Sequence, residues 1–319
     1  MENKVKIISM DTVEAEEIKW LWKPYIPFGK LTIIQGDPGE GKTTFALHIA
    51  SLLSQGKCFD EAEAMGMSEP VNVIYQTAED GLADTVKPRL ISAGADCSKI
   101  KVIDDGEKSL SMDDERLEIA IKETGAKLLI LDPLQAYLGD KIDMNRANEA
   151  REMTKKLGAL AERTGCAVVL IGHMNKGSNA KAAYRGMGSI DFYAIARSVL
   201  LVAKVPQNPN IRAVAQIKSN LAAEGETIAF QLDENGFTWI GEYDISADEL
   251  LAGCSNSDKR KTAEDFLKKV LANGQMVSAS SIFAQARSIG VSKRTIENVK
   301  QELGIKSIKD GASWLWKMN

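Results

Sequence analysis

The sequence predicts an α/β fold with a mostly parallel central sheet, followed by a small and mainly helical C-terminal domain. Three observations lead to this prediction. Short apolar segments alternate with segments of helical period as far as residue 171, a glycine-rich motif joins the first of these strands to the first helix, and the net charge changes sign near residue 258. Strand–helix alternation is typical of a parallel sheet that carries helices on both faces.

The elements of the first domain follow from hydrophobic period and turn residues. Apolar runs bounded by Gly, Asp or Pro predict strands at 31–34, 71–75, 100–103, 127–131 and 167–171. Helical periodicity between them predicts helices at 42–55, 80–92, 113–124 and 145–164. Turn residues at 208–210 and 234–236 accompany four further predicted strands, at 198–205, 211–218, 227–232 and 237–240. An aromatic-rich lead-in before residue 30 is expected to pack on an edge of the core.

The distribution of charge divides the chain. Residues 259–319 hold 12 Lys/Arg and 5 Asp/Glu, a net charge of +7, whereas the rest of the chain carries −11 and the whole chain −4. A basic segment on an acidic body favours a separate module that meets a polyanion, although a basic surface without a partner explains the charge equally well. We therefore expect a first domain at 1–250, a small polar linker at 251–258 and a second domain at 259–319.

The pattern of the second domain is typical of a winged helix-turn-helix. One apolar helical face begins at Ala263, a second helix spans 281–288, and a third begins at the N-cap Ser292 and stops at Gly304. A hairpin ending in Trp314-Leu315-Trp316 follows, and one of the two tryptophans is expected to pack the small core.

Several classes of protein are excluded by composition. The chain of 319 residues is 44% hydrophobic and 26% charged, which is ordinary for a globular protein and rules out disorder as a description of the whole chain. Nowhere does an apolar stretch reach the ~18–20 residues that span a bilayer, and Met1–Lys4 is not followed by an apolar signal core. The four cysteines have no metal-ligand spacing, so we expect a cytoplasmic protein that does not contact membranes.

A glycine-rich loop carries the strongest chemical signal. Residues 36–43 match G-x-x-x-x-G-K-[ST] between a strand and a helix. The glycines let consecutive backbone N–H groups face phosphate oxygens, and the helix N-terminus favours negative charge. In such a loop the lysine reaches the β- and γ-phosphates and the threonine hydroxyl ligates Mg²⁺. The sequence therefore predicts an ATP and Mg²⁺ site formed by Gly36, Asp37, Pro38, Gly39, Glu40, Gly41, Lys42, Thr43 and Thr44.

Two acidic positions complete the predicted catalytic set. Asp132 ends an apolar strand, at the edge where ligands bind in open α/β sheets, and we expect it to hold Mg²⁺ together with Thr43. The other interpretation is that Asp132-Pro133 is merely a strand-ending turn. Glu79 follows another strand and is the favoured base for activating water. Asp80 competes for that role, or caps the following helix.

Two further features bear on the reaction. His173 ends a strand of the same sheet and is a candidate catalytic residue that contacts the γ-phosphate, unless it is only a surface histidine; His48 is interpreted as structural. The segment 175–189 is rich in Lys, Gly, Ser and Asn and suits contact with single-stranded DNA, although an ordinary solvated loop has the same composition. Its candidate DNA-binding residues are Lys176, Lys181, Tyr184 and Arg185.

Six segments together resemble a known family. They are the loop start Gly36–Gly39, then Thr77–Asp80, Leu131–Pro133, Gly172–Lys176, Arg185–Ser189 and Ala196–Ser198. Over roughly residues 20–240 the chain resembles the RecA-like hexameric ATPases, specifically the RepA-like replicative helicases of plasmids and phages, which are relatives of DnaB- and KaiC-type motors. The resemblance implies a RecA-like P-loop NTPase core, a homo-hexamer that binds ATP between subunits, and movement along single-stranded DNA.

The resemblance also assigns roles to individual residues. It implies Glu79 as the acid that activates water and His173 as the γ-phosphate sensor, and it implies a basic finger that acts across the subunit interface. DnaB-like relatives carry Lys-x-Arg on a late strand, whereas this chain keeps Lys218 and lacks the arginine. The candidates for the finger are therefore Lys218, Arg197 and Arg212.

The third helix of the C-terminal domain is a second candidate contact for nucleic acid. Lys293 and Arg294 begin this helix, where side chains reach a groove or phosphates. We expect this winged-helix-like domain to bind duplex DNA, or alternatively a replication protein.

The leading functional hypothesis is a replicative DNA helicase, that is, a ring-forming ATPase stimulated by single-stranded DNA. A different class is a non-unwinding ATP switch, such as a recombination mediator, a loader or a KaiC-like regulator. A third is a DNA-binding regulator in which the winged helix carries the function. Slow hydrolysis without strand displacement would indicate the switch, and binding to a specific duplex would indicate the regulator.

Overall fold

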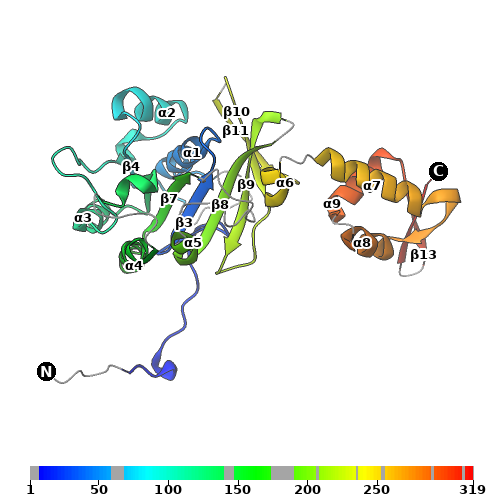
Figure 1. The fold of residues 1–319 in the computed structure, drawn as a ribbon, viewed down its shortest axis with the longest axis horizontal. Coiled ribbons are helices and arrows are strands. Elements are labelled where there is room, and N and C mark those ends of the chain that lie inside the picture. The colour runs from blue at the N-terminus through cyan, green and yellow to red at the C-terminus, as the bar shows by residue number, and fades with distance from the viewer. Residues whose placement is uncertain are drawn as a thin grey trace.

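The computed structural model describes residues 7–58, 68–139, 147–173, 190–205, 208–234, 236–252, 256–288, 291–310 and 313–318. Within these ranges the strands form a nine-stranded sheet and two smaller sheets of two and three strands. Figure 1 shows an α/β body built on the large sheet and a small C-terminal unit with its own helices.

The large sheet is mostly parallel, as predicted. Its strand order is β11-β10-β9-β8-β3-β7-β6-β4-β5. Strands β8, β3, β7, β6, β4 and β5 pair in parallel, and β9, β10 and β11 extend the sheet with antiparallel pairs. The strand bounds are β3 (Leu31–Gly36), β4 (Val73–Thr77), β5 (Ile100–Lys101), β6 (Leu128–Asp132), β7 (Ala167–His173), β8 (Ser198–Val205), β9 (Asn208–Ser219), β10 (Ile228–Asp233) and β11 (Gly236–Glu242).

Helices cover both faces of this sheet (Figure 1). The hydrophobic cluster on one face includes residues of α1 (Lys42–Gln55) and α2 (Lys87–Ser92). The cluster on the other face includes residues of α3 (Glu115–Thr124), α4 (Ala147–Thr164) and α5 (Ile190–Ile195). A short helix, α6 (Ala247–Ala252), packs on β8 and β9 beyond the second face. Short helical turns lie at η2 (Leu82–Val86), η3 (Cys97–Lys99) and η4 (Leu134–Tyr137).

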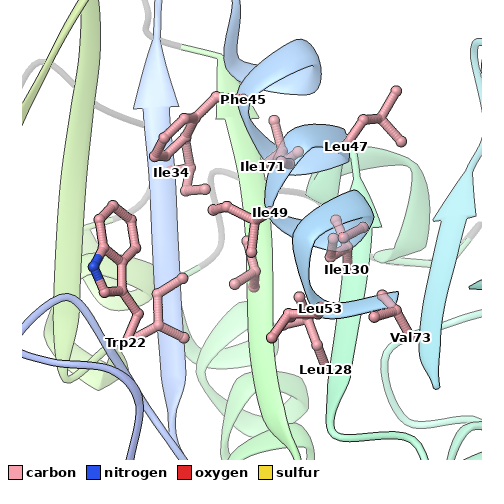
Figure 2. Packing of buried hydrophobic residues seen from close by; sticks show 14 of the residues in the cluster. Trp22, Ile34, Phe45, Leu47, Ile49, Leu53, Val73, Leu128, Ile130 and Ile171 are labelled. Atoms are coloured by element: carbon pink, nitrogen blue, oxygen red, sulfur yellow. The ribbon is translucent and has the colours of Figure 1, made fainter. Parts of the chain in front are cut away.

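The apolar face of α1 positions the helix that follows the glycine-rich loop. Figure 2 shows Phe45, Ile49 and Leu53 directed at the strands, where they meet Ile34 of β3 and Leu128 of β6. All of these side chains are at most 1% exposed. Because burial of each such side chain is worth about 1.5–3 kcal/mol, the start of α1 is held firmly over the sheet.

The lead-in packs on the core over part of its length. Strands β1 (Trp20–Trp22) and β2 (Ile26–Pro27) form a hairpin, and Trp22 and Tyr25 belong to the same core cluster as α1. Residues 7–19, which include the helical turn η1 (Met10–Thr12), are exposed instead and run away from the body in Figure 1. The prediction of a packed lead-in is therefore correct from residue 20 onward and wrong for 7–19.

Three predicted elements differ in detail. The helix predicted at 80–92 is divided into the π-helical turn η2 and α2, because Pro88 stands at the start of α2 and has no N–H to donate to a continuous helix. The strand predicted at 100–103 is only two residues long. The turn predicted at 208–210 is the start of β9, since Asn208 already pairs with Val205.

The C-terminal unit combines three helices with a three-stranded antiparallel sheet, ordered β12-β14-β13. Ten buried residues of this unit, among them Leu267, Ile296 and Trp316, form a separate hydrophobic cluster. The Ser292 hydroxyl accepts from the Thr295 N–H and so caps α9, as predicted. The elements are α7 (Asn256–Val270), η6 (Ala272–Gly274), β12 (Val277–Ser278), α8 (Ala279–Ser288), α9 (Lys293–Glu302), β13 (Lys306–Asp310) and β14 (Ser313–Lys317).

None of the helices in the described residues combines the length and the apolar character needed to cross a membrane.

Candidate functional site

The ends of four parallel strands bring the predicted catalytic residues to one edge of the sheet. Gly36 at the end of β3 lies beside His173 at the end of β7, and Asp132 at the end of β6 lies beside Thr77 at the end of β4. Glu79 follows β4 directly. These positions are far apart in the sequence, and the parallel register alone makes them neighbours. This edge is where open α/β sheets bind ligands.

The glycine-rich loop needs its glycines for different physical reasons. A Cβ on Gly36 would lie 2.1 Å from the Val202 carbonyl oxygen, so the loop starts in contact with the backbone of β8. Gly39 and Gly41 have φ values of +79° and +93°, which residues with a side chain rarely adopt. A Cβ on Gly39 would meet no atom within 4 Å, so the loop leaves open space there. This local geometry suits a cradle for phosphate oxygens.

Lys42 points back into this loop. Its ammonium donates hydrogen bonds to the carbonyl oxygens of Gly36, at 2.9 Å, and Asp37, at 2.8 Å. The residue is 4% exposed, and burial lowers the pKa of the ammonium although Asp132, Glu40 and other nearby carboxylates oppose the shift. The loop carbonyl oxygens carry only partial negative charge, so a bound phosphate group would give the Lys42 ammonium a fully charged partner.

Asp132 accepts hydrogen bonds from two other elements of the site. Its Oδ2 accepts hydrogen bonds from the Thr43 hydroxyl, at 2.7 Å, and from the Tyr75 hydroxyl, at 2.9 Å. Asp132 is 6% exposed, and burial raises the pKa of its carboxyl while the two hydroxyls lower it. A buried carboxylate and a hydroxyl within hydrogen-bond reach are oxygen donors of the kind that Mg²⁺ takes in phosphate sites, so the residues present fit that ion.

Glu79 and Asp80 have different surroundings. Asp80 forms a 2.7 Å ion pair with Arg89, and its backbone N–H donates to the Thr77 hydroxyl. Its carboxylate does not cap the next helix, which was one of the two roles predicted for it, because the N-cap of η2 is Gly81 and makes no side-chain cap. Glu79 is exposed, and its charge acts on Lys42. Of these two carboxylates, Glu79 is therefore the one available to a ligand at this edge.

His173 has an unsatisfied ring nitrogen. The ring is partly buried, and within the described residues its Nδ1 is buried without a hydrogen-bond partner. Buried nitrogens are usually paired, so one at a ligand edge is suited to a further acceptor or donor. Its pairing position opposite Gly36 places it beside the start of the loop.

Strands β8, β9 and β10 brace the other side of the loop. Glu40 accepts a short hydrogen bond from the backbone N–H of Lys204 and lies 3.8 Å from that lysine's ammonium. Arg212 is 9% exposed and donates to the carbonyl oxygens of Pro209 and Leu232, while its Cγ lies 3.6 Å from a Cβ built on Gly41. The Arg212 guanidinium is thus bound within the same chain, next to the loop of that chain.

The other two finger candidates lie at the opposite edge of the sheet. Arg197 precedes β8 and is exposed. Lys218 donates to the carbonyl oxygens of Tyr193, at 2.5 Å, and Ala194, at 3.1 Å, so it caps the end of α5. Burial, together with the charge of Arg197, lowers the pKa of Lys218.

The predicted DNA-binding residues divide into two groups. Lys176, Lys181, Tyr184 and Arg185 lie outside the described residues. Lys293 and Arg294 are exposed in the first turn of α9. That turn also contacts the α/β body, because the Thr295 hydroxyl donates to Asp244, at 3.0 Å, and Arg294 lies 3.6 Å from Glu242.

Tyr75 was missed in the sequence analysis, although it falls inside a predicted strand. Val73 and Tyr75 lie on the face of β4 that packs in the same core cluster as α1, and both are 0% exposed. The available signal was a phenolic hydroxyl within a strand predicted to be buried, because a buried Tyr O–H usually has a partner.

Comparison with known proteins identifies the family. The family model for AAA domains, AAA_25, matches residues 2–179, more than half of the chain. The chain belongs to this AAA domain family. Two solved structures have a similar fold. The KaiC-like protein PH0186 from Pyrococcus horikoshii OT3 covers 69% of this chain and 93% of its own at a TM-score of 0.50 and 20% identity. The second, an isolated ATPase domain, covers 66% and 84% at a TM-score of 0.50 and 16% identity. The fold is that of the RecA-like P-loop ATPases, as predicted.

Curated relatives of this AAA domain protein include proteins named DNA repair protein RadA. The one from Halalkalibacterium halodurans is 25% identical over 229 residues, which are 71% of this chain and 44% of that relative. The one from Bacillus subtilis is 22% identical over 262 residues, which are 81% and 51%. The chain thus spans about half the length of these relatives.

Proposed function

We propose that this protein is an ATPase that is stimulated by single-stranded DNA and forms a hexameric ring, most simply a replicative DNA helicase of the RepA-like type. The observation that carries the proposal is the convergence of Lys42, Thr43, Asp132, Glu79 and His173 at one edge of the sheet. The AAA domain match supports nucleotide hydrolysis.

Each of these residues has a part in the proposed reaction. The loop N–H groups and Lys42 hold the phosphates of ATP, and Lys42 exchanges its loop carbonyls for phosphate oxygens. Thr43 and Asp132 would hold Mg²⁺, and the chemistry that a bound Mg²⁺ would supply is neutralisation of charge on the phosphates. Glu79 accepts the proton of the attacking water. His173 uses its Nδ1, which has no partner in the described residues, to contact the γ-phosphate and so responds to the loss of this group.

The charge that stabilises the transition state comes from a neighbouring subunit in this proposal. Arg197 is the preferred candidate, because it is exposed and lies at the edge of the sheet opposite its own loop. Lys218 is the second candidate, although its ammonium is occupied by the end of α5. Arg212 is better suited to bracing its own loop, since its guanidinium bonds two carbonyls of its own subunit.

DNA is contacted in two places in this proposal. The segment that holds Lys176, Lys181, Tyr184 and Arg185 binds the single strand. The C-terminal unit acts as a winged helix, with Lys293 and Arg294 on phosphates of a duplex or, alternatively, on a replication protein. Support for this assignment comes from the +7 charge of residues 259–319 and from the exposure of both side chains.

A second candidate function is a non-unwinding DNA-repair or recombination ATPase. The match to proteins named RadA over 71% of this chain favours this function. The similarity in fold to a KaiC-like protein favours the related possibility of a regulatory ATP switch. Both candidates use the same nucleotide site, so the site does not distinguish them.

Hydrolysis of ATP with and without single-stranded DNA at low salt tests the proposal, with Glu79→Gln as the blank. Strong stimulation by single strands, followed by displacement of a strand from a forked duplex, is the result expected for a helicase. Stimulation without displacement would favour the repair ATPase. Hydrolysis that ignores single strands would contradict the helicase and favour a non-unwinding ATP switch.

A further inference from the structure

Tyr75 has a hydrogen bond that no catalytic role yet explains. Its hydroxyl donates to Asp132 Oδ2 at 2.9 Å, and the side chain is 0% exposed. The bond joins the middle of β4 to the last residue of β6. The ring fills the core beneath α1, but the hydroxyl reaches the one carboxylate that the proposed function assigns to Mg²⁺.

The strand register explains why the two side chains meet. Tyr75 pairs with Ile130, and Asp132 lies two residues further along β6, so both face the same side of the sheet. The Thr43 hydroxyl, in the first turn of α1, donates to the same oxygen. Three elements thus converge on Oδ2, and the hydrogen bonds found in the described residues leave Asp132 Oδ1 available to the metal and its water.

We propose that Tyr75 is a positioning residue for Mg²⁺, which fixes the orientation of the Asp132 carboxylate so that Oδ1 is presented to the ion. This inference rests on the proposed function. Partners that orient a metal-binding carboxylate from behind are worth about tenfold to a hundredfold in metal affinity. Without the Tyr75 hydroxyl, only Thr43 among the described residues donates to Oδ2, and the Asp132 carboxylate rotates more freely about its last torsion. Binding of the ion must then order the carboxylate, which lowers the affinity for Mg²⁺.

Tyr137 provides a matched control. It is 1% exposed and follows Asp132 by five positions in η4. In contrast to Tyr75, its hydroxyl is buried without a hydrogen-bond partner in the part of the chain that the structure describes. Both tyrosines therefore lose a buried hydroxyl when changed to Phe, but only one of the two loses a bond to Asp132.

The test is a Mg²⁺ titration of nucleotide binding, which does not depend on turnover. Binding of a fluorescent ATP analogue is measured in EDTA and over a range of Mg²⁺ concentrations, for the wild type, Tyr75→Phe and Tyr137→Phe. We expect Tyr75→Phe to need about tenfold more Mg²⁺ for half-maximal enhancement of binding, and Tyr137→Phe to match the wild type. Affinity in EDTA and kcat at saturating Mg²⁺ should stay within about twofold, because the residue acts through Asp132.

Replacement of Tyr75 by 4-aminophenylalanine, which restores a donor at the same place, should recover most of the Mg²⁺ affinity; it also serves if Tyr75→Phe folds poorly. An unchanged Mg²⁺ requirement in Tyr75→Phe would overturn the positioning role, and so would an equal rise in Tyr137→Phe. If the wild type and Lys42→Ala bind the analogue equally weakly with Mg²⁺ present, the proposed function itself has failed.

Discussion

Arg89 and Asp80 form an ion pair with 2.7 Å between the guanidinium and the carboxylate, directly beside the exposed Glu79. Because Asp80 is paired with Arg89, Glu79 is the one of these two neighbouring carboxylates that can reach water at the sheet edge. An exposed ion pair of this kind adds little stability, about 0–1 kcal/mol, so its main consequence concerns which of the two acids is available.

We therefore predict different effects for two amide substitutions. Glu79→Gln should lower kcat for ATP by about 10²–10⁴-fold with nucleotide binding retained, because the water loses its base. Asp80→Asn should lower kcat only a few fold. Steady-state hydrolysis and nucleotide binding, measured on both variants, check this. A large loss in Asp80→Asn with near-normal Glu79→Gln would reverse the assignment.

The contact between Gly36 and β8 predicts a loss of stability. A Cβ at this position would lie 2.1 Å from a backbone oxygen of Val202, which cannot move as a flexible side chain does. Gly36→Ala should destabilise the protein by about 1–3 kcal/mol or more, which thermal unfolding would report as a lower Tm.

Gly158 is the matched control for this substitution. It lies inside α4, and a Cβ there would be 3.9 Å from a Leu31 methyl, an ordinary contact. Gly158→Ala should leave Tm unchanged or raise it, since alanine favours a helix over glycine by about 1 kcal/mol. Equal Tm values for the two variants would mean that the loop does not pack on β8 as closely as described.

His48 predicts a pH dependence of stability. Its ring stacks on Phe237 with centroids 3.8 Å apart, and burial lowers its pKa to about 4, from 6.5. The unfolded chain therefore binds a proton at this position more readily than the folded chain. The contribution of neutral His48 to the free energy of unfolding is therefore fully present above pH 6.5 and is lost as the pH falls toward 4.

Replacement of His48 by Phe keeps a stacking ring without the titration. Tm of His48→Phe should fall less steeply than that of the wild type between about pH 6.5 and 4, and the two proteins should respond alike between about pH 7 and 8. Circular dichroism melts at a series of pH values measure this. Parallel curves throughout the acid range would show that protonation of His48 does not contribute.

The two cations at the far edge of the sheet predict distinct variants. Arg197 is exposed, so Arg197→Ala should keep the wild-type Tm. In rings assembled from wild-type and variant subunits, the ATPase activity should fall by more than the fraction of variant subunits. Lys218 caps α5, so Lys218→Ala should lower the free energy of unfolding by about 0.5–1.5 kcal/mol, which a lower Tm would report. Mixing experiments at fixed total protein test the first expectation. A strictly linear loss of activity with the Arg197→Ala fraction would argue against catalysis across subunits.

The order of strands and helices in the body followed from local pattern. The loop at 36–43, the strand that ends in Asp132 and the N-cap Ser292 were all predicted, because each depends on a few adjacent residues. The prediction was wrong where a single residue altered local geometry, as Pro88 does by dividing the helix at 80–92. It missed α5 and α6, which are only six residues long and too short to show helical period.

A phosphate and metal site could be predicted from sequence alone, because a contiguous motif and the polar residues at strand ends indicate such a site wherever the strands lie. Tertiary structure decided which side chains share a partner. Tyr75 meets Asp132 through the register of β4 and β6, and Lys218 meets the carbonyls of α5 through the pairing of β8 and β9. Such contacts join segments tens of residues apart, and no local period records the alignment that brings them together.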